Sequence, residues 1–377
     1  MARLGGDEFT VLLSRLAHPE DAAKVAQRIV EQLGRPYSID GHELFVSASV
    51  GIAVYPGDGA DVDTLLKNAD VAMYAAKDGG RNGYRFFSQE LNTVALERLD
   101  LERDLHRALE RKEFVLHYQP QVDTLSGRVT GVEALLRWSN PQRGMVPPAK
   151  FIPIAEQTGL IVPIGKWVLD EACRQGRAWS DQGLGLEMWV NVSGVQFRDR
   201  GLAQAVQGAL ETTGFDPRLL VIEATESILM EARDTSLATL EALRQLGASV
   251  AIDDFGTGYS SLAYLKRFPL DTLKIDGSFV RGLEVGNEDR AIVSAIIALA
   301  RSLNIGVLAE GVETRQQAER LTELGCARMQ GFLYSPALPA QELPEVMRGL
   351  AAQLSTRTGP APAHLRAVPR AAAARLP

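Results

Sequence analysis

The chain has 377 residues, of which 46% are hydrophobic and 23% are charged, and its formal net charge at pH 7 is -7. This length accommodates two domains, one of which can be a barrel of about 250 residues. The acidic balance argues against a general nucleic-acid-binding protein, which normally carries a net basic surface, so we expect no nucleic-acid polymer as partner. Any polyanionic ligand would be held by local positive groups or by metal ions.

Cys173 and Cys326 are the only cysteines, and they stand far apart in no metal-ligand spacing. This usage indicates reduced, partly buried thiols in a cytoplasmic protein. The longest nearly uninterrupted apolar run, residues 291–300, is too short to cross a bilayer, and no signal peptide opens the chain. We therefore expect a cytoplasmic chain without a membrane segment, while a membrane or sensory segment upstream of a truncated start stays open.

Residues 1–88 are predicted to form a first unit of mixed helix and strand. The run Gly5-Gly6-Asp7-Glu8-Phe9 is typical of a hairpin turn whose second strand continues to Leu13. A helix over 20–33, a strand over 45–55 and a helix over 61–77 follow. Residues 89–112 then form a charged linker helix, either a solvated connector with one apolar stripe or a helix that transmits a signal.

Two further motifs follow the G-G-D-E-F turn, namely residues 49–53 (S-V-G-I-A) and 69–77 (A-D-V-A-M-Y-A-A-K). Together the three motifs resemble the second half of a GGDEF domain, the diguanylate cyclase fold. That family's earlier metal-binding Asp, guanine-site residues and inhibitory Arg-x-x-Asp site are absent here. Because two-metal phosphoryl chemistry needs carboxylates from both strands, we expect no cyclase activity. A hypothesis is that Met1 is an internal start, which an authentic mature N-terminus at Met1 would refute.

Residues 113–346 alternate between strand-like and helix-like segments. Strands are expected over 114–121, 131–138, 187–192, 219–224, 249–253, 272–275, 306–309 and 328–333, with helices such as 164–179, 202–212, 235–246, 289–303 and 314–324 between them. This alternation predicts an α/β fold with a mostly parallel sheet, and eight strands predict a closed (β/α)8 TIM-like barrel. The last helix should end near Gly349, and residues 347–377 form an Ala-, Pro- and Arg-rich tail expected to be disordered or, alternatively, to touch an acidic partner weakly.

Most of the expected strands end in a carboxylate, an amide or a lysine. The strand over 249–253 ends in two adjacent carboxylates, Asp253 and Asp254, which repel each other and favour a hard divalent cation. The alternative is that this pair only caps the next helix and begins a turn. Because the C-terminal strand ends of a barrel meet at one mouth, the polar residues of different strands should converge there.

Each member of this set also has a structural alternative when it is considered alone. Glu133 can pair with Arg137, and Asn191 can cap a helix. Lys274 can bridge to Asp276. Capping does not explain the recurrence at most strands, and no phosphate-binding loop of the form G-x-x-x-x-G-K-[ST] is present.

Seven short motifs stand at these strand ends, namely 133–137 (E-A-L-L-R), 191–193 (N-V-S), 223–226 (E-A-T-E), 253–261 (D-D-F-G-T-G-Y-S-S), 274–276 (K-I-D), 310–313 (E-G-V-E) and 330–331 (Q-G). As a set they closely resemble the EAL domain, the cyclic-di-GMP-specific phosphodiesterase family, over nearly all of residues 113–345. The resemblance implies a barrel with one irregular strand direction. Gly194-Val195 and Pro336-Ala337 replace the family's more usual Ala-Arg and Arg-Pro, which affects substrate contacts rather than metal ligation.

The resemblance implies a role for each matching residue. Two Mg²⁺ or Mn²⁺ ions would share Asp253, with the first bound also by Glu133, Asn191 and Glu223 and the second also by Asp254 and Glu310. Lys274 would position or help deprotonate a water, its pKa lowered by the metal-rich surroundings, and would act with Glu133 and Glu310. Substrate contacts would come from Gln119, Arg137, Asp276 and Gln330. The loop over 255–261 would be anchored by Glu226 and Glu313.

The implied activity is metal-dependent hydrolysis of cyclic-di-GMP to linear pGpG, in a homodimer formed through the EAL domain. Two alternatives stay open: a receptor that binds cyclic-di-GMP without cutting it, and an inert scaffold for protein interactions. Because every metal-binding residue of the motifs is present, hydrolysis is favoured. Residues 1–88 would then either regulate the barrel or merely burden it.

Overall fold

A computed structural model describes residues 1–14, 16, 18–39, 42–199, 201–231, 233–256, 265–284 and 286–355. The chain divides into two compact units, Met1–Asp104 and Leu105–Pro377, which are described separately here. Within the described ranges, no helix is both long enough and apolar enough to cross a membrane. The expected loop beyond Gly256 and the expected tail from residue 356 onward lie outside the described residues.

The strands of the first unit form three two-stranded sheets. Strands β1 (Ala2–Gly5) and β2 (Glu8–Thr10) pair antiparallel around Gly6, whose φ of 52° is favourable for glycine, so the expected hairpin is confirmed. Strands β3 (Tyr37–Ile39) and β4 (His42–Leu44) form a second hairpin, and β5 (Ser49–Ile52) pairs in parallel with β6 (Gly83–Phe86). The expected strands over 9–13 and 45–55 were too long, because the backbone pairs only over these shorter segments.

Three helices accompany these sheets: α1 (Asp21–Leu33), α2 (Val62–Asp78) and α3 (Gln89–Ala108). Helix α2 begins where the side chain of Asp61 accepts a hydrogen bond from the backbone N–H of Thr64 at 2.8 Å. Strand β5 lies so close to α2 that a Cβ at Gly51 would stand 1.8 Å from the carbonyl oxygen of Ala69. The glycine of the S-V-G-I-A motif is therefore required for this helix–strand contact.

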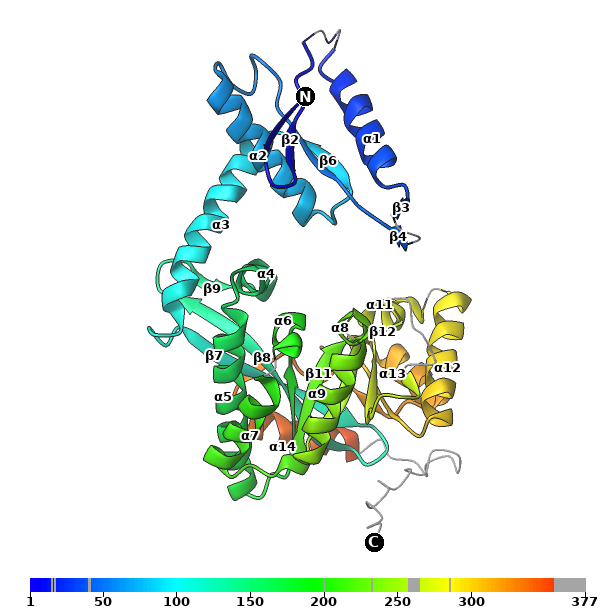
Figure 1. The fold of residues 1–377 in the computed structure, drawn as a ribbon. Helices are drawn as coiled ribbons and strands as arrows, with labels where there is room; N and C mark the ends of the chain where they lie inside the picture. Colours follow the sequence, from blue (N-terminus) through cyan, green and yellow to red (C-terminus); the bar gives the residue numbers. More distant parts are fainter. Residues whose placement is uncertain are drawn as a thin grey trace. The chain divides into compact units, whose positions relative to one another are not determined.

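The second unit contains a closed barrel of eight strands (Figure 1). Around the barrel the order is β7, β15, β14, β13, β12, β11, β10 and β8, and the pairing of β7 with β8 closes it. Their bounds are β7 (Phe114–Asp123), β8 (Arg128–Asn140), β10 (Glu187–Asn191), β11 (Leu220–Thr225), β12 (Ser249–Phe255), β13 (Thr272–Ile275), β14 (Gly306–Ala309) and β15 (Arg328–Met329). Two short strands, β9 (Gly144–Val146) and β16 (Leu338–Pro339), pair with β8 and β7.

Strand β7 runs antiparallel to both of its neighbours in the barrel, β8 and β15, whereas the other barrel pairings are parallel. The expected TIM-like barrel is thus confirmed, together with its one irregular strand direction. The last strand was expected to reach residue 333, but β15 ends at Met329. Beyond it the backbone turns against Val312, where a Cβ at Gly331 would lie 2.1 Å from the Val312 carbonyl oxygen.

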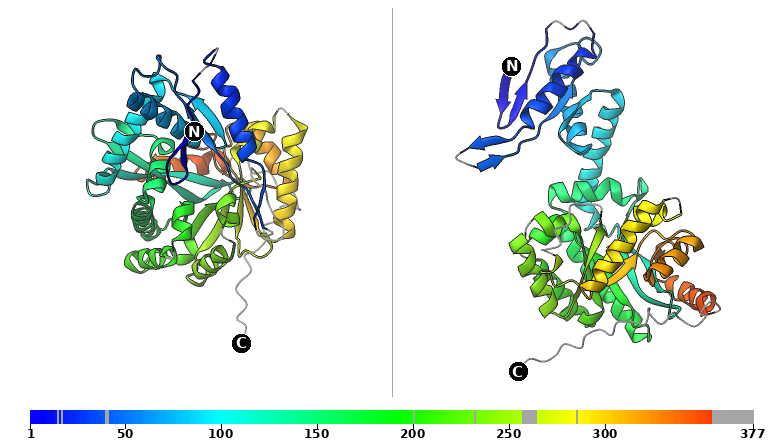
Figure 2. Two further views of the ribbon diagram at one scale, coloured as in Figure 1. Left: turned by 45° about the horizontal axis from the view of Figure 1, so that its top comes forward. Right: turned by 90° about the vertical axis from the view of Figure 1, so that its right-hand side faces the viewer.

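Helices surround the strands (Figures 1 and 2). They are α4 (Pro148–Thr158), α5 (Ile161–Asp181), α6 (Gly194–Arg198), α7 (Leu202–Thr213), η1 (Pro217–Leu219), α8 (Glu226–Glu231), α9 (Arg233–Gln245), α11 (Gly277–Gly282), α12 (Asn287–Ser302), α13 (Arg315–Leu324) and α14 (Leu343–Ser355). Helix α14 continues through Gly349 to Ser355, so the expected helix end near Gly349 is wrong, and so is the disorder expected for residues 347–355 of the tail. It continues because Leu350 and Leu354 pack on Val122 of the barrel.

The barrel interior is built in layers. Side chains that point into a barrel recur at every second residue of a strand. Trp189, Val221, Ala251 and Leu308, one each from β10, β11, β12 and β14, form a buried apolar cluster. The residue two positions further along each of these strands is polar or acidic, so the apolar layer forms a floor beneath the polar residues at the strand ends. Cys173 and Cys326 are both buried and free, as expected.

Candidate active site

Asp253 and Asp254 end strand β12 in an irregular conformation. Adjacent residues of a regular strand point to opposite faces, so both carboxylates could not face the barrel mouth. The pairing of β12 with β13 shifts register between Ile252 and Phe255, and Asp254 adopts a left-handed conformation with φ of 53°. As a result, carboxylate oxygens of Asp253, Asp254 and Glu310 lie within 4.8 Å of one another. A local distortion of this kind is common beside functional sites.

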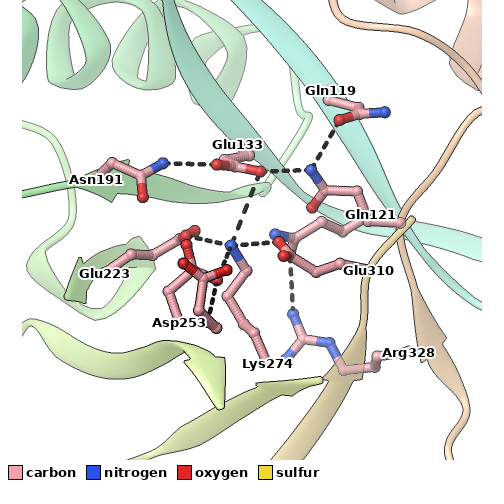
Figure 3. Close-up of polar contacts among 11 residues, drawn as sticks. Gln119, Gln121, Glu133, Asn191, Glu223, Asp253, Lys274, Glu310 and Arg328 are labelled. Atoms are coloured by element: carbon pink, nitrogen blue, oxygen red, sulfur yellow. Dashed lines mark hydrogen bonds and ion pairs between the residues drawn. The ribbon is translucent and has the colours of Figure 1, made fainter. Parts of the chain in front are cut away.

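Lys274 is the centre of the cluster and is wholly buried. Its Nζ lies 2.5 Å from Oε1 of Glu310 and 3.2 Å from Oδ1 of Asp253 (Figure 3). It also donates a short hydrogen bond to Glu223, and Oε2 of Glu133 is 3.9 Å away. The contacts of Lys274 are with the carboxylates of Glu133, Glu223, Asp253 and Glu310, at the ends of four other strands. The alternative, an ion pair between Lys274 and Asp276, is not among them.

The pKa of Lys274 is raised well above its ordinary value. Burial opposes the charged ammonium, but the negative charges of Glu133, Glu223, Glu310 and Asp253 outweigh that effect. The lowering expected from the sequence concerned an amine beside bound metal ions, so it stays a prediction for the metal-loaded site; the four carboxylates by themselves raise the pKa of Lys274. The amine is charged at neutral pH, which suits a hydrogen-bond donor rather than a proton acceptor.

The carboxylates around Lys274 also have raised pKa values, which for an acid favours the neutral form. Burial raises the pKa of Glu310 to about 8 and that of Asp254 to about 6, and neighbouring carboxylates such as Asp253 add to both shifts. Burial also raises the pKa of Glu223 well above its usual range. One lysine does not compensate this many acids, so a bound cation would relieve their repulsion. The cluster of Asp253, Asp254 and Glu310 is chemically suited to a hard metal ion.

Both carboxylate oxygens of Glu133 are held by neutral amides. Nδ2 of Asn191 donates to Oε1 at 2.6 Å, and Nε2 of Gln330 donates to Oε2 at 2.5 Å. The same Nε2 lies 3.0 Å from Oε1 of Gln119, whose own Nε2 donates to the carbonyl oxygen of Ser335 at 3.0 Å. These bonds join β7, β8, β10 and the end of β15 around one buried acid (Figure 3).

Two buried acceptors of the site, Oε1 of Glu223 and Oε1 of Gln330, have no hydrogen-bond partner among the residues that the structure describes, and that of Glu223 is a carboxylate oxygen. Leaving such an atom unpaired costs about 1–3 kcal/mol. A carboxylate oxygen that points into an acidic cluster without a donor fits a metal ligand better than a structural hydrogen bond. The donor set of the mouth, carboxylates and one amide, therefore fits a hard divalent ion.

The remaining sequence-predicted residues lie around the edge of this cluster. Arg137 is half-buried and donates to the carbonyl oxygen of Leu136, and burial lowers the pKa of its guanidinium. Asp276 caps helix α11 by accepting from the N–H of Ser278 at 2.9 Å, and its charge contributes to the raised pKa of Asp254.

The two predicted loop anchors behave differently. Oε2 of Glu226 accepts a hydrogen bond from the backbone N–H of Gly256 at 3.3 Å, directly after strand β12. The Glu313 side chain is exposed. The backbone N–H of Glu313 donates to Oε1 of Gln317 at 2.8 Å. The structure thus joins Glu226 to the loop start but leaves Glu313 outside the cluster.

Sequence reasoning missed a group of side chains deeper in the barrel: Gln121, Glu187 and Arg328. Arg328 pairs with Glu187 at 2.5 Å. Its Nη2 also lies 3.5 Å from Oε1 of Gln121, the contact drawn in Figure 3. The available signal was spacing, since Gln121 and Arg328 each stand two residues from a predicted site residue on the same strand.

Family models match both parts of the chain. The model described as EAL domain matches residues 102–337, and the model described as diguanylate cyclase, GGDEF domain, matches residues 1–83. The chain belongs to the EAL domain family, and its N-terminal part matches a partial GGDEF domain, so both resemblances seen in the sequence are confirmed.

Characterised relatives extend beyond this chain. The bifunctional diguanylate cyclase/cyclic di-GMP phosphodiesterase MucR of Pseudomonas aeruginosa is 53% identical over 344 residues, which are 91% of this chain and 50% of MucR. The cyclic di-GMP phosphodiesterase PdeR of Escherichia coli is 43% identical over 340 residues, 90% of this chain and 51% of PdeR. The chain thus spans about half the length of these relatives.

Solved structures resemble the second unit most directly. A PaMucR phosphodiesterase in complex with c-di-GMP is 53% identical, with a TM-score of 0.63, and the match covers 65% of this chain and 99% of that one. The EAL enzyme Bd1971 in its cGMP-bound form is 33% identical, with a TM-score of 0.64 and 76% of each chain covered. The barrel fold and the family are therefore supported independently of the sequence motifs.

Proposed function

We propose that this chain is a metal-dependent phosphodiesterase that hydrolyses cyclic-di-GMP to linear pGpG and so lowers the level of this bacterial second messenger. The observation that carries the proposal is the cluster of Asp253, Asp254 and Glu310, which meets the buried Lys274 at the barrel mouth. Relatives described as cyclic di-GMP phosphodiesterases and the PaMucR complex with c-di-GMP supply the substrate class.

Charge balance supports two divalent ions. The five acids at the mouth and the one lysine leave four negative charges uncompensated when all are ionised, and two divalent cations would neutralise them. Bound Mg²⁺ or Mn²⁺ would supply Lewis-acid polarisation of the phosphodiester and an acidified water. We propose that the ions share Asp253, with Glu133, Asn191 and Glu223 on the first and Asp254 and Glu310 on the second.

The chain's own side chains would orient the reacting groups. Lys274, whose Nζ lies among the carboxylates of the mouth, would position the attacking water or help to deprotonate it. Asn191 and Gln330 fix the orientation of Glu133 through their hydrogen bonds. A preorganised acid of this kind loses little free energy to reorientation during the reaction.

The substrate would be contacted by residues around the edge of the mouth. Arg137 would supply a cation for a phosphate oxygen, because a charged guanidinium binds this anion more strongly than a neutral side chain does. Gln119, Asp276 and Gln330 supply hydrogen-bonding groups for the nucleotide. Glu226 would anchor the loop that follows Gly256, whereas an anchoring role for Glu313 would depend on its backbone contact with Gln317.

The test uses purified protein, cyclic-di-GMP and either Mg²⁺ or Mn²⁺, with products separated by chromatography. Asp253→Asn keeps the shape of the shared ligand but removes its charge, and we expect turnover to fall at least about 10²-fold, the scale of losing one strong transition-state interaction. Asp181→Asn, which removes only a surface partner of Arg177, is the matched control. Binding without product would favour the receptor, and neither binding nor product would favour the scaffold.

We also propose the organisation of the chain around this activity. Residues 1–88 would be a partial GGDEF domain without cyclase activity and 89–112 a linker helix. The catalytic barrel would begin at residue 113 and include helix α14, with a tail after it. The catalytic form would be a cytoplasmic homodimer assembled through the EAL domain. Light scattering of the purified chain tests the dimer, and a monomer at working enzyme concentrations would refute it.

A further inference from the structure

The layer one step below the proposed metal site is apolar at β10, β11, β12 and β14 but carries polar side chains at β7 and β15. Arg328 stands two residues before Gln330 at β15, and Trp189 stands two residues before Asn191 on β10. Gln121, wholly buried, stands two residues from Gln119 on the oppositely running β7. The two-residue period of strands therefore stacks this layer directly under the amides that hold Glu133.

Arg328 makes several directed contacts within that layer. Its Nη2 lies 2.5 Å from Oε2 of Glu187, and its guanidinium carbon is 5.2 Å from the centroid of the Trp189 ring. The indole Nε1 of Trp189 donates to the same Oε2 of Glu187 at 3.2 Å. With side-chain exposures of 23% for Arg328 and 16% for Glu187, this pair is largely shielded from water, so it is stronger than a surface ion pair.

Two sets of side-chain contacts thus connect β15 to β10, which are not neighbours in the sheet. The upper set runs from Gln330 through Glu133 to Asn191. The lower set runs from Arg328 to Glu187 and Trp189. Strand β15 is only two residues long, but it pairs with both β14 and β7, and the backbone of Gln330 is bonded to Ala309 and Val312. The side-chain contacts add to these backbone bonds in setting the position of Gln330.

Strand β8 is shaped to leave room for the lower contacts. Gly131 stands two residues before Glu133, and a Cβ there would lie 2.9 Å from the carbonyl oxygen of Glu187 and 3.1 Å from Nε1 of Trp189. Real Cβ atoms essentially never approach backbone atoms this closely, so a side chain at this position would displace Glu187 or Trp189. The same strand therefore carries the proposed ligand and makes space for the contacts beneath it.

We propose that Arg328 is a positioning residue for the metal site. Through Glu187 and Trp189 it fixes the end of β15 relative to β10, so that Gln330 and Asn191 together hold both oxygens of Glu133. Arg328 is not one of the proposed metal ligands or substrate contacts, and it would act through Glu187 and Trp189. This inference rests on the proposed function, because it concerns the orientation of a proposed metal ligand.

The experiment measures Mn²⁺ binding directly, by the electron paramagnetic resonance signal of free Mn²⁺ in titrations of the full chain without substrate. Arg328→Met keeps an unbranched apolar stem but removes the charge and the planar fork of the guanidinium. We expect its dissociation constant for Mn²⁺ to rise about 10-fold, the lower end of the effect of losing a residue that orients a metal ligand. Arg328→Lys, which keeps the charge, should show a smaller rise.

The matched control is Arg174→Met, which breaks an arginine–glutamate pair of similar geometry on the surface of α5, where Arg174 bonds Glu171 at 2.6 Å. Its Mn²⁺ affinity should equal that of the unaltered chain. If Arg328→Met does not fold, as judged by circular dichroism, Glu187→Gln removes the same ion pair with a smaller change and takes its place.

The outcomes separate this inference from the proposed function. Weaker Mn²⁺ binding in Arg328→Met or Glu187→Gln, with Arg174→Met unaffected, supports the positioning role. If the unaltered chain binds Mn²⁺ and both interior variants bind it equally well, the positioning role is wrong even if they melt at a lower temperature. If the unaltered chain binds no Mn²⁺, the proposed metal site itself fails, and this inference fails with it.

Discussion

Replacing Lys274 with methionine tests the electrostatic design of the site. The side chain is wholly buried and lies within 3.9 Å of carboxylate oxygens of Glu133, Glu223, Asp253 and Glu310. Methionine fills a similar volume but carries no charge, so the acids face one another without their shared ammonium. The expected consequence is a less stable metal-free protein and loss of phosphodiesterase activity.

Removing one partner of a buried ion pair usually costs about 3–5 kcal/mol, because an uncompensated charge is left behind. Proton uptake by the acids offsets part of this cost, since burial already raises the pKa of Glu310 to about 8 and Lys274 no longer lowers it. We therefore expect the free energy of unfolding at pH 8 to fall by about 3 kcal/mol. For a domain of this size that is a shift of about 6–12 °C in Tm.

The loss should depend on pH in a defined direction. The pKa of Lys274 is higher in the folded chain than in the unfolded chain. The stability that its ion pairs give the unaltered chain is therefore fully present at any pH below the unfolded pKa, which includes pH 5 to pH 8. In Lys274→Met the pKa values of Glu310 and Asp254, already raised by burial, are no longer lowered by the lysine, so these two acids hold their protons in the folded chain to a higher pH than in the unaltered chain. The difference in unfolding free energy between the two chains should therefore widen as the pH rises.

Differential scanning calorimetry in EDTA at pH 5 and pH 8 makes the comparison, with the exposed Lys266→Met as the matched control. Surface substitutions of this kind usually change stability by no more than about 0.5 kcal/mol. If Lys274→Met differs from the unaltered chain by no more than Lys266→Met at pH 8, the buried ion pairs do not stabilise the barrel. The electrostatic account of the site would then be wrong.

Two further predictions concern metal affinity and the first unit. Because burial raises the pKa of Asp254 to about 6 and that of Glu310 to about 8, protons compete with a cation for these oxygens, and Mn²⁺ affinity measured by calorimetric titration should fall as the pH drops from 8 to 6. An affinity independent of pH would contradict the ligand assignment. The fragment 113–355, which keeps helix α14, should match the kinetics and Tm of the barrel in the whole chain, and neither should convert GTP to cyclic-di-GMP; a slower or less stable fragment would show that the residues before 113 regulate or support the barrel.

Alternating apolar segments and their polar ends were sufficient to predict the barrel and the residues at its mouth. Each strand carries its own signal, since a run such as Val250 to Ile252 is buried whichever neighbours it has. The same reasoning placed Glu133, Asn191, Glu223 and Lys274 at one end of the sheet. It failed for β15 and for the end of α14, where contacts with Val312 and Val122 set the boundaries instead of local sequence preference.

The partners of each charged residue were decided only by the tertiary structure. From the sequence alone, Asp276 was a possible ion-pair partner of Lys274, because the two residues are close in the chain. In the folded chain Asp276 caps α11, while Lys274 contacts acids at the ends of four other strands. The direction of its pKa shift followed from that arrangement, because it depends on how many carboxylates lie within a few ångströms of the amine.

The sequence by itself determined which residues could serve the chemistry, through strand ends and side-chain types. The folded chain alone decided that Asp253 and Asp254 face the same way, because that depends on a register shift against β13 and a left-handed Asp254. It also decided that Arg328 lies beneath Glu133, because β7 runs against its neighbours and closes the barrel. Distances between residues remote in the chain are set by strand order and register, which no local pattern specifies.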